Sequence, residues 1–496
     1  MSNTQSGRAI DLGIDLGTSE VKVVAIERDA LLASGAAAIP ISRPRPQWSE
    51  QSPDDWWTAT GSAIAQLRQA LGTDWSLVRA IGLSGQMHGA VILDSDHQVL
   101  RPAILWNDTR SSEQCRWLEQ REPKSRSITG NLAMPGFTAP KLVWVAQNEP
   151  ALFARVAKVL LPKDWLRWRM TGEFVSEPSD AAGTLWLDVG ARQWSSAMLQ
   201  ATSMTIGQMP RLVEGNQVSG TVAASVSTEW QLPAGVVVAG GAGDNAASAI
   251  GVGAIHPGEG FVSLGTSGVV FVVNDRFAPN PADAVHAFCH ALPQRWHQMA
   301  VTLSAASCLR WLKELLNADS EAQLEALARE LGDRQCESAP IFLPYLSGER
   351  TPHNDAQASG LFEGLRSNHG RADFAYAVLE GVAFSLADGI AALRRAGTQV
   401  DGLTLVGGGS RSRFWGRLIA SAADCTLIVR QASEVSAALG AARLGAMART
   451  GHIDEHARAA PVAEAIQPES SLSARLKPRL ARYRALYPAI HCLPRS

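Results

Sequence analysis

Short apolar runs followed by glycine turns recur along the chain and predict buried strands. Residues 235–254, GVVVAGGAGDNAASAIGVGA, begin with three valines, continue through a glycine turn and end in a run of small residues. β-Branched residues favour an interior strand, glycines permit a sharp turn and alanines favour a helix. Asp244 therefore lies at the C-terminal edge of a predicted strand, where ligands bind in open α/β sheets. The alternative is that Asp244 only caps the following helix, because aspartate is a favoured N-cap residue.

Two predicted hairpins, one in each half of the chain, share the sequence LGTS. Residues 9–27 predict two strands around the turn Gly17-Thr18-Ser19, and residues 261–272 predict two strands around Gly265-Thr266-Ser267. Such turns offer backbone N–H groups and hydroxyls that suit phosphate oxygens. Asp15 lies in the first apolar run, where a carboxylate is costly unless it meets a cation, and it could hold a hydrated Mg²⁺. A single turn of this kind is weak evidence, but its repetition indicates a duplicated α/β ATPase.

Two further strand ends carry polar side chains that suit a small polyol. Residues 78–93 predict two strands around the turn SGQMHG, and residues 104–110 place WNDTR at another strand end. Because these strand ends are close in sequence, we expect one shared site, although His88 alone is more simply a hydrogen-bonded structural histidine. The candidate residues are Met87, His88, Trp106, Asn107 and Asp108.

A third glycine turn follows the strand predicted within residues 403–420, LTLVGGGSRSRFWGRLIA. A glycine turn that opens a helix suits a nucleotide, although three adjacent glycines are not the spaced dinucleotide-binding pattern. The candidate residues here are Gly408, Gly409 and Ser410. Helices are also predicted from the tryptophan pair at 56–57 to about residue 71, and over residues 163–173, 373–397, 434–448 and 474–487.

Composition limits the classes of protein that the chain can represent. With 496 residues, 46% hydrophobic and 19% charged, it predicts a globular protein of at least two domains. The formal net charge of −2 provides no bulk attraction to nucleic acid or to an anionic membrane, so neither is expected as a partner. The N-terminal residues lack an apolar signal segment, and the six cysteines form no C-x-x-C pair, which predicts a cytoplasmic protein with reduced thiols.

Taken together, these motifs resemble the FGGY family of carbohydrate kinases. DLGTS at 15–19 is similar to the first phosphate motif, LGTSG at 264–268 to the second and GGGSRS at 407–412 to the adenosine motif. GFTAPKLVWVAQN at 136–148 and GLFEGLRSNHGRADFAYAVLEG at 360–381 resemble further signatures. The family's fold implies an α/β, two-lobed, actin-like ATPase (ribonuclease H-like) with duplicated domains and a catalytic cleft between them. The expected segments are residues 9–241, residues 242–450 and a C-terminal helical extension over residues 451–496.

The resemblance also implies a role for each motif. Asp244 would be the general base, and Asp15 would hold Mg²⁺ through water. ATP phosphates would face Gly17, Thr18, Ser19, Gly265, Thr266 and Ser267, and the adenosine would lie against Gly408, Gly409 and Ser410. The sugar contacts would include Met87, His88, Trp106, Asn107, Asp108 and Asn245. A homodimer is a further expectation from the family.

The sugar-facing motifs resemble the members of the family that phosphorylate xylulose. SGQMHG at 84–89, GDNAASA at 243–249 and LPYLSGERTPHND at 343–355 carry this likeness. The implied reaction is ATP-dependent phosphorylation of D-xylulose at its 5-hydroxyl. The alternatives are another substrate of the family, namely ribulose, L-xylulose, gluconate or glycerol, or a non-catalytic ATPase of the same fold. Glu20 and Ala242 depart from the usual family pattern, and Glu20 near the phosphates could weaken nucleotide binding.

Overall fold

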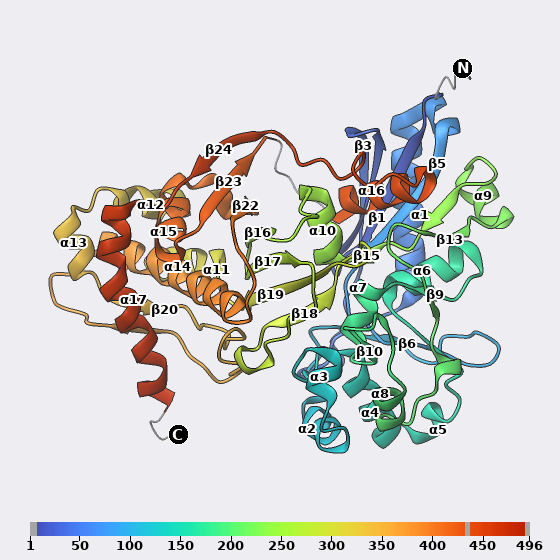
Figure 1. Ribbon diagram of the computed structural model, residues 1–496, viewed down its shortest axis with the longest axis horizontal. Coiled ribbons are helices and arrows are strands. Elements are labelled where there is room, and N and C mark those ends of the chain that lie inside the picture. Colours follow the sequence, from blue (N-terminus) through green and yellow to red (C-terminus); the bar gives the residue numbers. More distant parts are fainter. Residues whose placement is uncertain (1–6, 432–436, 492–496) are drawn as a thin grey trace.

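The computed structural model describes residues 7–431 and 437–491 and shows two lobes, each built on a seven-stranded sheet (Figure 1). The strands of the first sheet, in spatial order, are β13 (Val218–Thr221), β14 (Val237–Ala239), β5 (Val78–Gly85), β1 (Ile10–Leu16), β2 (Glu20–Glu27) and β3 (Ala30–Ala38), with β15 (Ala242–Gly243) also paired to β5. Those of the second are β18 (His286–Cys289), β19 (Trp296–Thr302), β17 (Gly268–Asn274), β16 (Glu259–Leu264), β22 (Gly402–Val406), β23 (Thr426–Arg430) and β24 (Val462–Ile466).

The two sheets repeat one topology. In the first, β1 is parallel to β5 and β5 to β14, whereas β1, β2 and β3 are successively antiparallel. In the second, β16 is parallel to β22 and β22 to β23, whereas β16, β17 and β19 are successively antiparallel. Each LGTS sequence therefore forms the turn of the equivalent hairpin. The predicted fold class, a duplicated α/β fold with two lobes, is confirmed.

Helices and short strands complete the first lobe. The helices are α1 (Pro53–Leu71), α2 (Ser112–Arg121), α3 (Ser125–Thr129), α4 (Thr138–Asn148), α5 (Pro150–Phe153), α6 (Pro162–Thr171), α7 (Pro178–Ala181), α8 (Ser196–Ala201) and α9 (Ala224–Trp230). The short strands are β4 (Glu50–Gln51), β6 (Val91–Leu93), β7 (Ala103–Ile104), β8 (Lys158–Leu160), β9 (Val175–Ser176), β10 (Leu187–Asp188), β11 (Gln193–Trp194) and β12 (Arg211–Leu212). Most of these elements lie below the first sheet in Figure 1, where they extend the lobe.

The second lobe surrounds one long apolar helix. Its helices are α11 (Ala306–Leu315), α12 (Glu321–Arg329), α13 (Asp333–Ser338), α14 (Arg371–Arg395), α15 (Arg413–Ala423) and α17 (Ser470–His491), and its remaining strands are β20 (Ile341–Leu343) and β21 (Leu361–Glu363). Within the described residues, α14 alone has the length and apolar composition of a membrane span. However, 94% of its most apolar window is buried inside the protein, as expected of a core helix.

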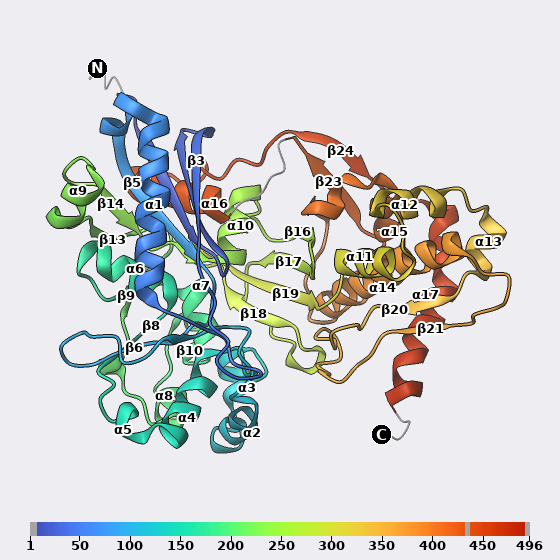
Figure 2. The ribbon, with the colours of Figure 1, turned by 180° about the vertical axis from the view of Figure 1, so that it is seen from behind.

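Two helices at the junction of the lobes, α10 (Asp244–Val252) and α16 (Ala437–Thr450), pack against each other. Although α16 comes from the end of the chain, it covers one face of the first sheet, and α1 covers the opposite face (Figures 1 and 2). The contact is very close: a Cβ atom on Gly440 of α16 would lie 1.7 Å from the carbonyl oxygen of Ala247, and one on Gly82 of β5 would lie 1.7 Å from that of Ala441. The small residues of α16 thus allow backbone-to-backbone packing.

Some of the predicted boundaries in this part of the chain can be compared with the structure. The helix predicted over residues 434–448 corresponds to α16, and its first three residues lie outside the described ones. The division of the chain at residues 241 and 242 stays a prediction, as does that at 450 and 451. β24 was not predicted, because four of its five residues are exposed and carry no alternating pattern.

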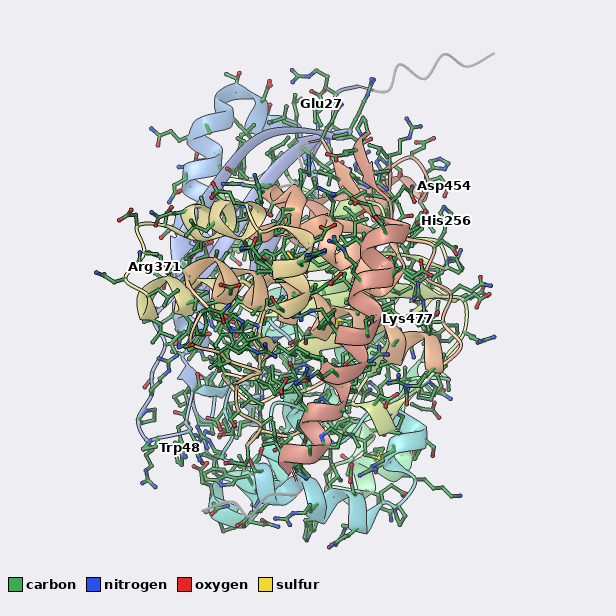
Figure 3. All side chains as sticks on the ribbon, turned by 90° about the vertical axis from the view of Figure 1, so that its left-hand side faces the viewer. Glu27, Trp48, His256, Arg371, Asp454 and Lys477 are labelled. Atoms are coloured by element: carbon green, nitrogen blue, oxygen red, sulfur yellow. The ribbon has the colours of Figure 1, made fainter. Side chains whose placement is uncertain are left out.

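Charged side chains of both signs lie on the outer surface. Figure 3 views the molecule from the side of α17, and Arg371, Asp454 and Lys477 are exposed there. This mixture agrees with the small net charge of the chain.

Candidate active site

Asp15 and Asp244 lie on either side of the end of β5. Asp15, near the end of β1, is paired with Ser84 of β5. On the other side, β15 is also parallel to β5, with Gly243 paired to Gly85, and Asp244 follows directly. The C-terminal edge of three neighbouring strands thus carries two carboxylates, at the edge where α/β sheets bind ligands.

Asp244 is the first residue of α10, and the N-cap position belongs to Gly243. The alternative in which Asp244 itself is the N-cap is therefore wrong. Its Oδ1 atom accepts hydrogen bonds from the backbone N–H of Asn245 at 2.7 Å and from the Asn245 side-chain amide at 2.9 Å. Burial raises the pKa of Asp244, and the two bonds from Asn245 counteract part of that rise. Such a carboxylate is a better proton acceptor than one in free solution.

Asp15 is a half-buried carboxylate with spare acceptor capacity. Its Oδ1 atom is inaccessible to solvent, and no described residue donates a hydrogen bond to it. Burial and then the negative charge of Asp244 raise the pKa of Asp15 to about 6. Carboxylate oxygens are ligands that Mg²⁺ prefers, directly or through water. An orphaned acceptor beside a second carboxylate therefore fits a hydrated divalent cation.

Hydrogen bonds tie the first phosphate-type turn to the side chains of Trp106 and Gln86. The Thr18 hydroxyl accepts a hydrogen bond from the Trp106 indole at 2.9 Å and donates to Gln86 Oε1 at 3.1 Å. Within the turn, the Gly17 N–H is already bonded to the Glu20 carbonyl at 3.0 Å, and Ser19 is exposed. The turn thus has a fixed backbone, with Ser19 open to solvent.

The second turn and the glycine turn lie together in the other lobe. The first residues of α11 donate to carbonyls of the 265–267 turn: Ala306 N–H to Gly265 at 2.9 Å, and Ala305 N–H to Thr266 at 2.9 Å. Cβ atoms on Gly407 or Gly409 would lie 2.8 Å from atoms of Leu264, the residue before this turn. Gly408 faces open space, whereas Ser410 is buried. The structure therefore brings two of the predicted nucleotide motifs into contact.

A cavity of about 320 Å³ is lined by both lobes, and its wall includes Trp106, which is bonded to Thr18 of the first turn. The first lobe supplies His88, Trp106, Asn107, Thr109 and the segment 134–137. The second lobe supplies His286, Leu303, Ser347, Glu349, Arg350, Asn354 and Ala356. A cavity shared by two lobes can be closed around a small ligand by their relative movement.

His88 is a neutral imidazole in this cavity wall. Its backbone adopts φ = +70°, and Nδ1 lies 2.7 Å from the carbonyl oxygen of Gly183. Since a carbonyl can only accept, Nδ1 carries the proton and Nε2 is left as an acceptor. Burial lowers the pKa of His88 to about 3, so the ring stays neutral at physiological pH. Met87 is buried beside the turn that precedes Asp244, with its sulfur 2.9 Å from the place of a Cβ on Gly243.

Two further sugar candidates, Asn107 and Asp108, differ in their surroundings. Asn107 lines the cavity, and its Oδ1 atom is buried without a hydrogen-bond partner among the described residues. Asp108 is fully buried, does not line the cavity, and accepts bonds from Ser49 N–H at 2.6 Å and from the Arg110 guanidinium at 2.6 and 2.9 Å. Both oxygens of Asp108 are thus engaged by the loop around it, and its assignment to the sugar stays a prediction.

Sequence patterns did not single out the second-lobe wall of the cavity. Arg350 donates to His286 Nε2 at 3.3 Å, and His286 Nδ1 donates to Asn131 Oδ1 at 3.2 Å. Burial lowers the pKa of His286 well below its usual range. A neutral ring agrees with these bonds, because Nε2 can accept from Arg350 only when it carries no proton. The Arg350 guanidinium has five N–H donors, so donors remain for a ligand in the cavity in addition to the bond to His286. The segment 343–355 resembles the family, but its residues follow no helical or strand period, so the sequence alone does not indicate that it lines a cavity.

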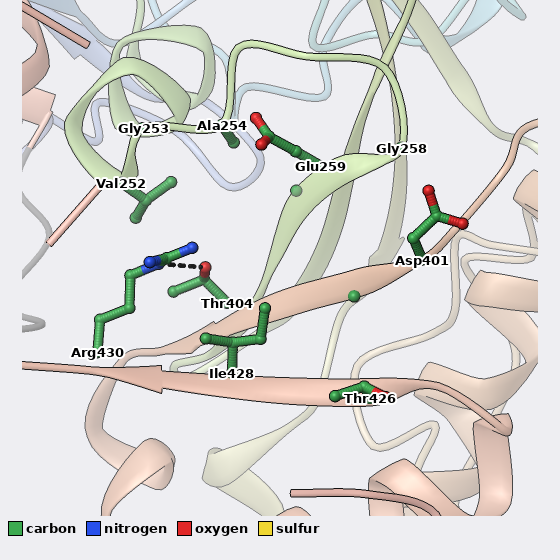
Figure 4. Close-up of a pocket in the computed structure, with 12 residues that line it drawn as sticks. Val252, Gly253, Ala254, Gly258, Glu259, Asp401, Thr404, Thr426, Ile428 and Arg430 are labelled. Atoms are coloured by element: carbon green, nitrogen blue, oxygen red, sulfur yellow. Dashed lines mark hydrogen bonds between the residues drawn. The ribbon is translucent and has the colours of Figure 1, made fainter. Parts of the chain in front are cut away.

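A second cavity, of about 310 Å³, lies elsewhere on the second lobe (Figure 4). It is lined by Glu259, Gly402 and Thr426, which are the first residues of β16, β22 and β23. In it, the Arg430 guanidinium donates to the Thr404 hydroxyl at 3.1 Å. The cavity therefore begins at the N-terminal ends of these strands and extends along β23 to Arg430, and none of the predicted site residues lines it.

Two sequence models describe the halves of a known enzyme family and match this chain. The model of the N-terminal domain of the FGGY family of carbohydrate kinases matches residues 10–251, and that of the C-terminal domain matches residues 260–449. The chain belongs to the FGGY family of carbohydrate kinases. The three glycine-containing turns and the two carboxylates thus lie in an FGGY kinase.

Relatives of this FGGY kinase match over nearly their whole length. The xylulose kinase of Escherichia coli (strain K12) is 49% identical over 482 residues, which cover 96% of this chain and 98% of the relative. That of Klebsiella pneumoniae is 51% identical over 441 residues, covering 88% of this chain and 89% of the relative. The crystal structure of a xylulose kinase from Brucella ovis superposes with a TM-score of 0.93 at 51% identity, covering 98% of this chain and all of that one.

Proposed function

We propose that this protein is an ATP-dependent xylulose kinase that transfers the γ-phosphoryl group of ATP to the 5-hydroxyl of D-xylulose. The observation that carries the proposal is the placement of Asp15 and Asp244 on either side of the end of β5, whose following turn carries His88 into the wall of a cavity lined by both lobes. Relatives at about 50% identity that are xylulose kinases support the choice of sugar.

In the proposed reaction, Asp244 accepts the proton of the attacking hydroxyl. Phosphoryl transfer needs an aligned hydroxyl, screening of the phosphate charge and a base. The pKa of Asp244 is raised by burial, which favours proton uptake, and Asn245 holds the carboxylate in one orientation. Asp244 would thus deprotonate the hydroxyl as the oxygen–phosphorus bond forms.

The nucleotide would bind between the glycine turns. We propose that Ser19 and the turn of residues 17–19 contact one side of the phosphates, and that Thr266 and Ser267, both exposed, contact the other. Gly408, which faces open space, would allow the adenosine to approach the backbone. Asp15 would hold Mg²⁺, which supplies positive charge to the phosphate oxygens when bound.

The sugar would occupy the cavity between the lobes. His88 Nε2 and Asn107 Oδ1 are acceptors for sugar hydroxyls, and the Arg350 guanidinium is a donor for a hydroxyl or the keto oxygen. Closure of the two lobes around the sugar would exclude water, which otherwise competes for the phosphoryl group. Without sugar, we expect slow hydrolysis of ATP.

The decisive experiment measures ADP release with ATP and Mg²⁺ in the presence of D-xylulose, L-xylulose, D-ribulose, gluconate or glycerol. We expect strong stimulation by D-xylulose, and a loss of 10²-fold or more in Asp244→Ala, as for removal of a general base (about 10²–10⁴-fold). Stimulation by another sugar of the panel would keep the mechanism and overturn the substrate. Slow hydrolysis that is equal in both proteins, with no sugar effect, would overturn the kinase proposal.

A further inference from the structure

Five charged side chains form a cluster inside the first lobe, away from solvent. Lys163, Asp164 and Arg167 come from α6, Glu177 precedes α7 and Asp180 lies in α7. All five are fully buried. Charged residues are almost never buried to this extent unless they are paired. We call this group the buried charge cluster.

The cluster is held together by short ion pairs. Lys163 Nζ lies 2.8 Å from Asp164, 3.0 Å from Asp180 and 3.3 Å from Glu177. Arg167 lies 3.0 Å from the same Asp164 oxygen. Lys163 is therefore the common partner of all three carboxylates.

The charges of the cluster nearly cancel. Two cations face three carboxylates, which leaves one excess negative charge if all are ionised. Burial raises the pKa of Asp180 to about 8, although the positive charge of Lys163 counteracts it. Burial would lower the pKa of Lys163, but the three carboxylates outweigh this effect and raise it. A raised pKa of Asp180 is the response expected of a carboxyl group that shares one cation with two other carboxylates.

Two bonds connect the cluster to the turn that leads into Asp244. The Arg167 guanidinium donates to the carbonyl oxygen of Gly240. At the other end of the turn, the N–H of Gly243 donates to the Ser179 hydroxyl at 3.1 Å. Ser179 is itself fixed, because the Glu177 carboxylate accepts its backbone N–H at 2.6 Å.

The turn fits its surroundings with little freedom. Gly241 adopts φ = +75°, and a Cβ there would lie 2.2 Å from the carbonyl oxygen of Leu83. A Cβ on Gly240 would lie 2.3 Å from the carbonyl oxygen of Glu214. The turn is therefore enclosed by β5 and the 214–215 segment, and the cluster binds both of its ends. Buried ion pairs are often no more stabilising than apolar residues of similar volume, so stability alone does not explain the cluster.

We propose that the buried charge cluster, through Arg167 and Ser179, fixes the turn of residues 240–243 and thereby positions Asp244 for proton transfer. Arg167 and Ser179 are then positioning residues, since neither lines the cavity between the lobes. This inference rests on the proposed kinase function. A small displacement of a reacting group lowers a catalysed rate strongly while leaving substrate contacts in place.

The test compares two serine substitutions in this region. Ser179→Ala removes the hydroxyl that binds the turn, whereas Ser176→Ala removes a bond to Asp164 of 2.6 Å that does not involve the turn. Both serines are fully buried, so the two variants are matched in size and burial. Arg167→Lys is a third variant, which keeps the charge but cannot donate to both the Val175 and Gly240 carbonyls in the planar geometry of arginine. For each, kcat, both KM values and the thermal unfolding midpoint are measured.

We expect kcat to fall about tenfold in Ser179→Ala and Arg167→Lys with D-xylulose. The KM values for sugar and ATP should stay within about twofold, and Ser176→Ala should keep the wild-type kcat. A wild-type kcat in both Ser179→Ala and Arg167→Lys, with an active wild type, would overturn the positioning role alone. A wild-type protein without sugar-dependent ADP release would overturn the proposed function and this inference together.

Discussion

At the residue scale, Asp244 combines a half-buried carboxylate with two hydrogen-bond donors supplied by Asn245. The proposed reaction requires the unprotonated form, so activity is lost as pH falls through the pKa of this group. Because burial raises that pKa, the acidic limb of the kcat/KM profile should lie above pH 3.8. Asp15 is close enough to influence the same titration, and the observed value therefore belongs to the pair of carboxylates.

Asn245→Ala should move this acidic limb to higher pH. The substitution removes the side-chain donor at 2.9 Å from Asp244 Oδ1, which favours the charged form. Loss of one such bond corresponds to roughly one pH unit. The measurement is kcat/KM for D-xylulose between pH 4 and 9. Ser248→Ala is the control, because Ser248 bonds to the Asp244 main-chain carbonyl and not to the carboxylate. A limb that stays in place or moves to lower pH in Asn245→Ala would contradict the assignment.

Arg350→Ala should weaken sugar binding more than it slows the chemical step. The side chain lines the cavity between the lobes, where we propose that the sugar binds, and it is held by His286. Loss of a charged hydrogen bond costs about 1.5–3 kcal/mol, or roughly 10- to 100-fold in KM for the sugar. Steady-state kinetics with each substrate varied would measure it, and the exposed Arg366→Ala provides a control. An unchanged sugar KM would show that Arg350 does not contact the substrate.

At the element scale, α16 comes from the C-terminal half of the chain but packs on the sheet of the first lobe. It packs on β1 and β5 and against α10, the helix that begins with Asp244. The contacts depend on glycine and alanine, because even a methyl group at some positions would overlap a backbone carbonyl. A helix of larger residues could not approach the sheet so closely.

Gly440→Ala should therefore destabilise the protein, in contrast to the usual effect of alanine in a helix. The added Cβ would lie 1.7 Å from the Ala247 carbonyl oxygen, and overpacking of this kind costs about 1–3 kcal/mol or more. Gly61→Ala in α1 is the matched control, because its Cβ would meet its nearest neighbour, the Trp230 indole, at 3.8 Å. Alanine there should stabilise the helix by up to about 1 kcal/mol. Thermal unfolding of both variants tests the pair, and equal shifts would contradict it.

Sequence patterns could predict the elements whose apolar residues recur regularly. Residues 9–27 gave β1, the turn and β2, and the helix predicted over 373–397 is α14 over Arg371–Arg395. The charges inside α6 could not be recognised, because Lys163 and Arg167 find partners on a separate segment, at Glu177 and Asp180 or at Gly240. Likewise, the loop that carries Arg350 becomes a cavity wall only after both lobes have folded. The assignments of site residues to ATP and sugar stay predictions.

At the scale of the whole molecule, the chain leaves the first sheet after α10 and returns to it at α16. One face of β1 and β5 is thus covered by residues that come more than 350 positions after Gly82. An ion pair between Arg449 of α16 and the buried Asp11 of β1, with both nitrogen–oxygen distances at 2.8 Å, adds to this contact. The first lobe is therefore incomplete without the end of the chain.

A fragment of residues 1–241 should not fold alone. Without α10 and α16 it would expose the apolar and glycine-lined face of β1 and β5 to water. Co-expression with residues 242–496 should restore soluble protein, since the missing helices are then supplied in trans. Soluble yield and a cooperative thermal transition are the readouts. A fragment that is soluble and melts cooperatively by itself would show that the first lobe does not need these helices.

The cavity between the lobes has a consequence for protein engineering. Its walls are loops around residues 107, 134–137 and 347–356, whereas the phosphate-type turns belong to hairpins of the two sheets. A library that varies these loops can therefore change which polyol is accepted while the machinery for ATP is retained. Trp106 should stay constant in such a library, because its indole is bonded to Thr18 and its loss would disturb the first turn. New substrate ranges are thus most accessible through the loops that bear no phosphate contact.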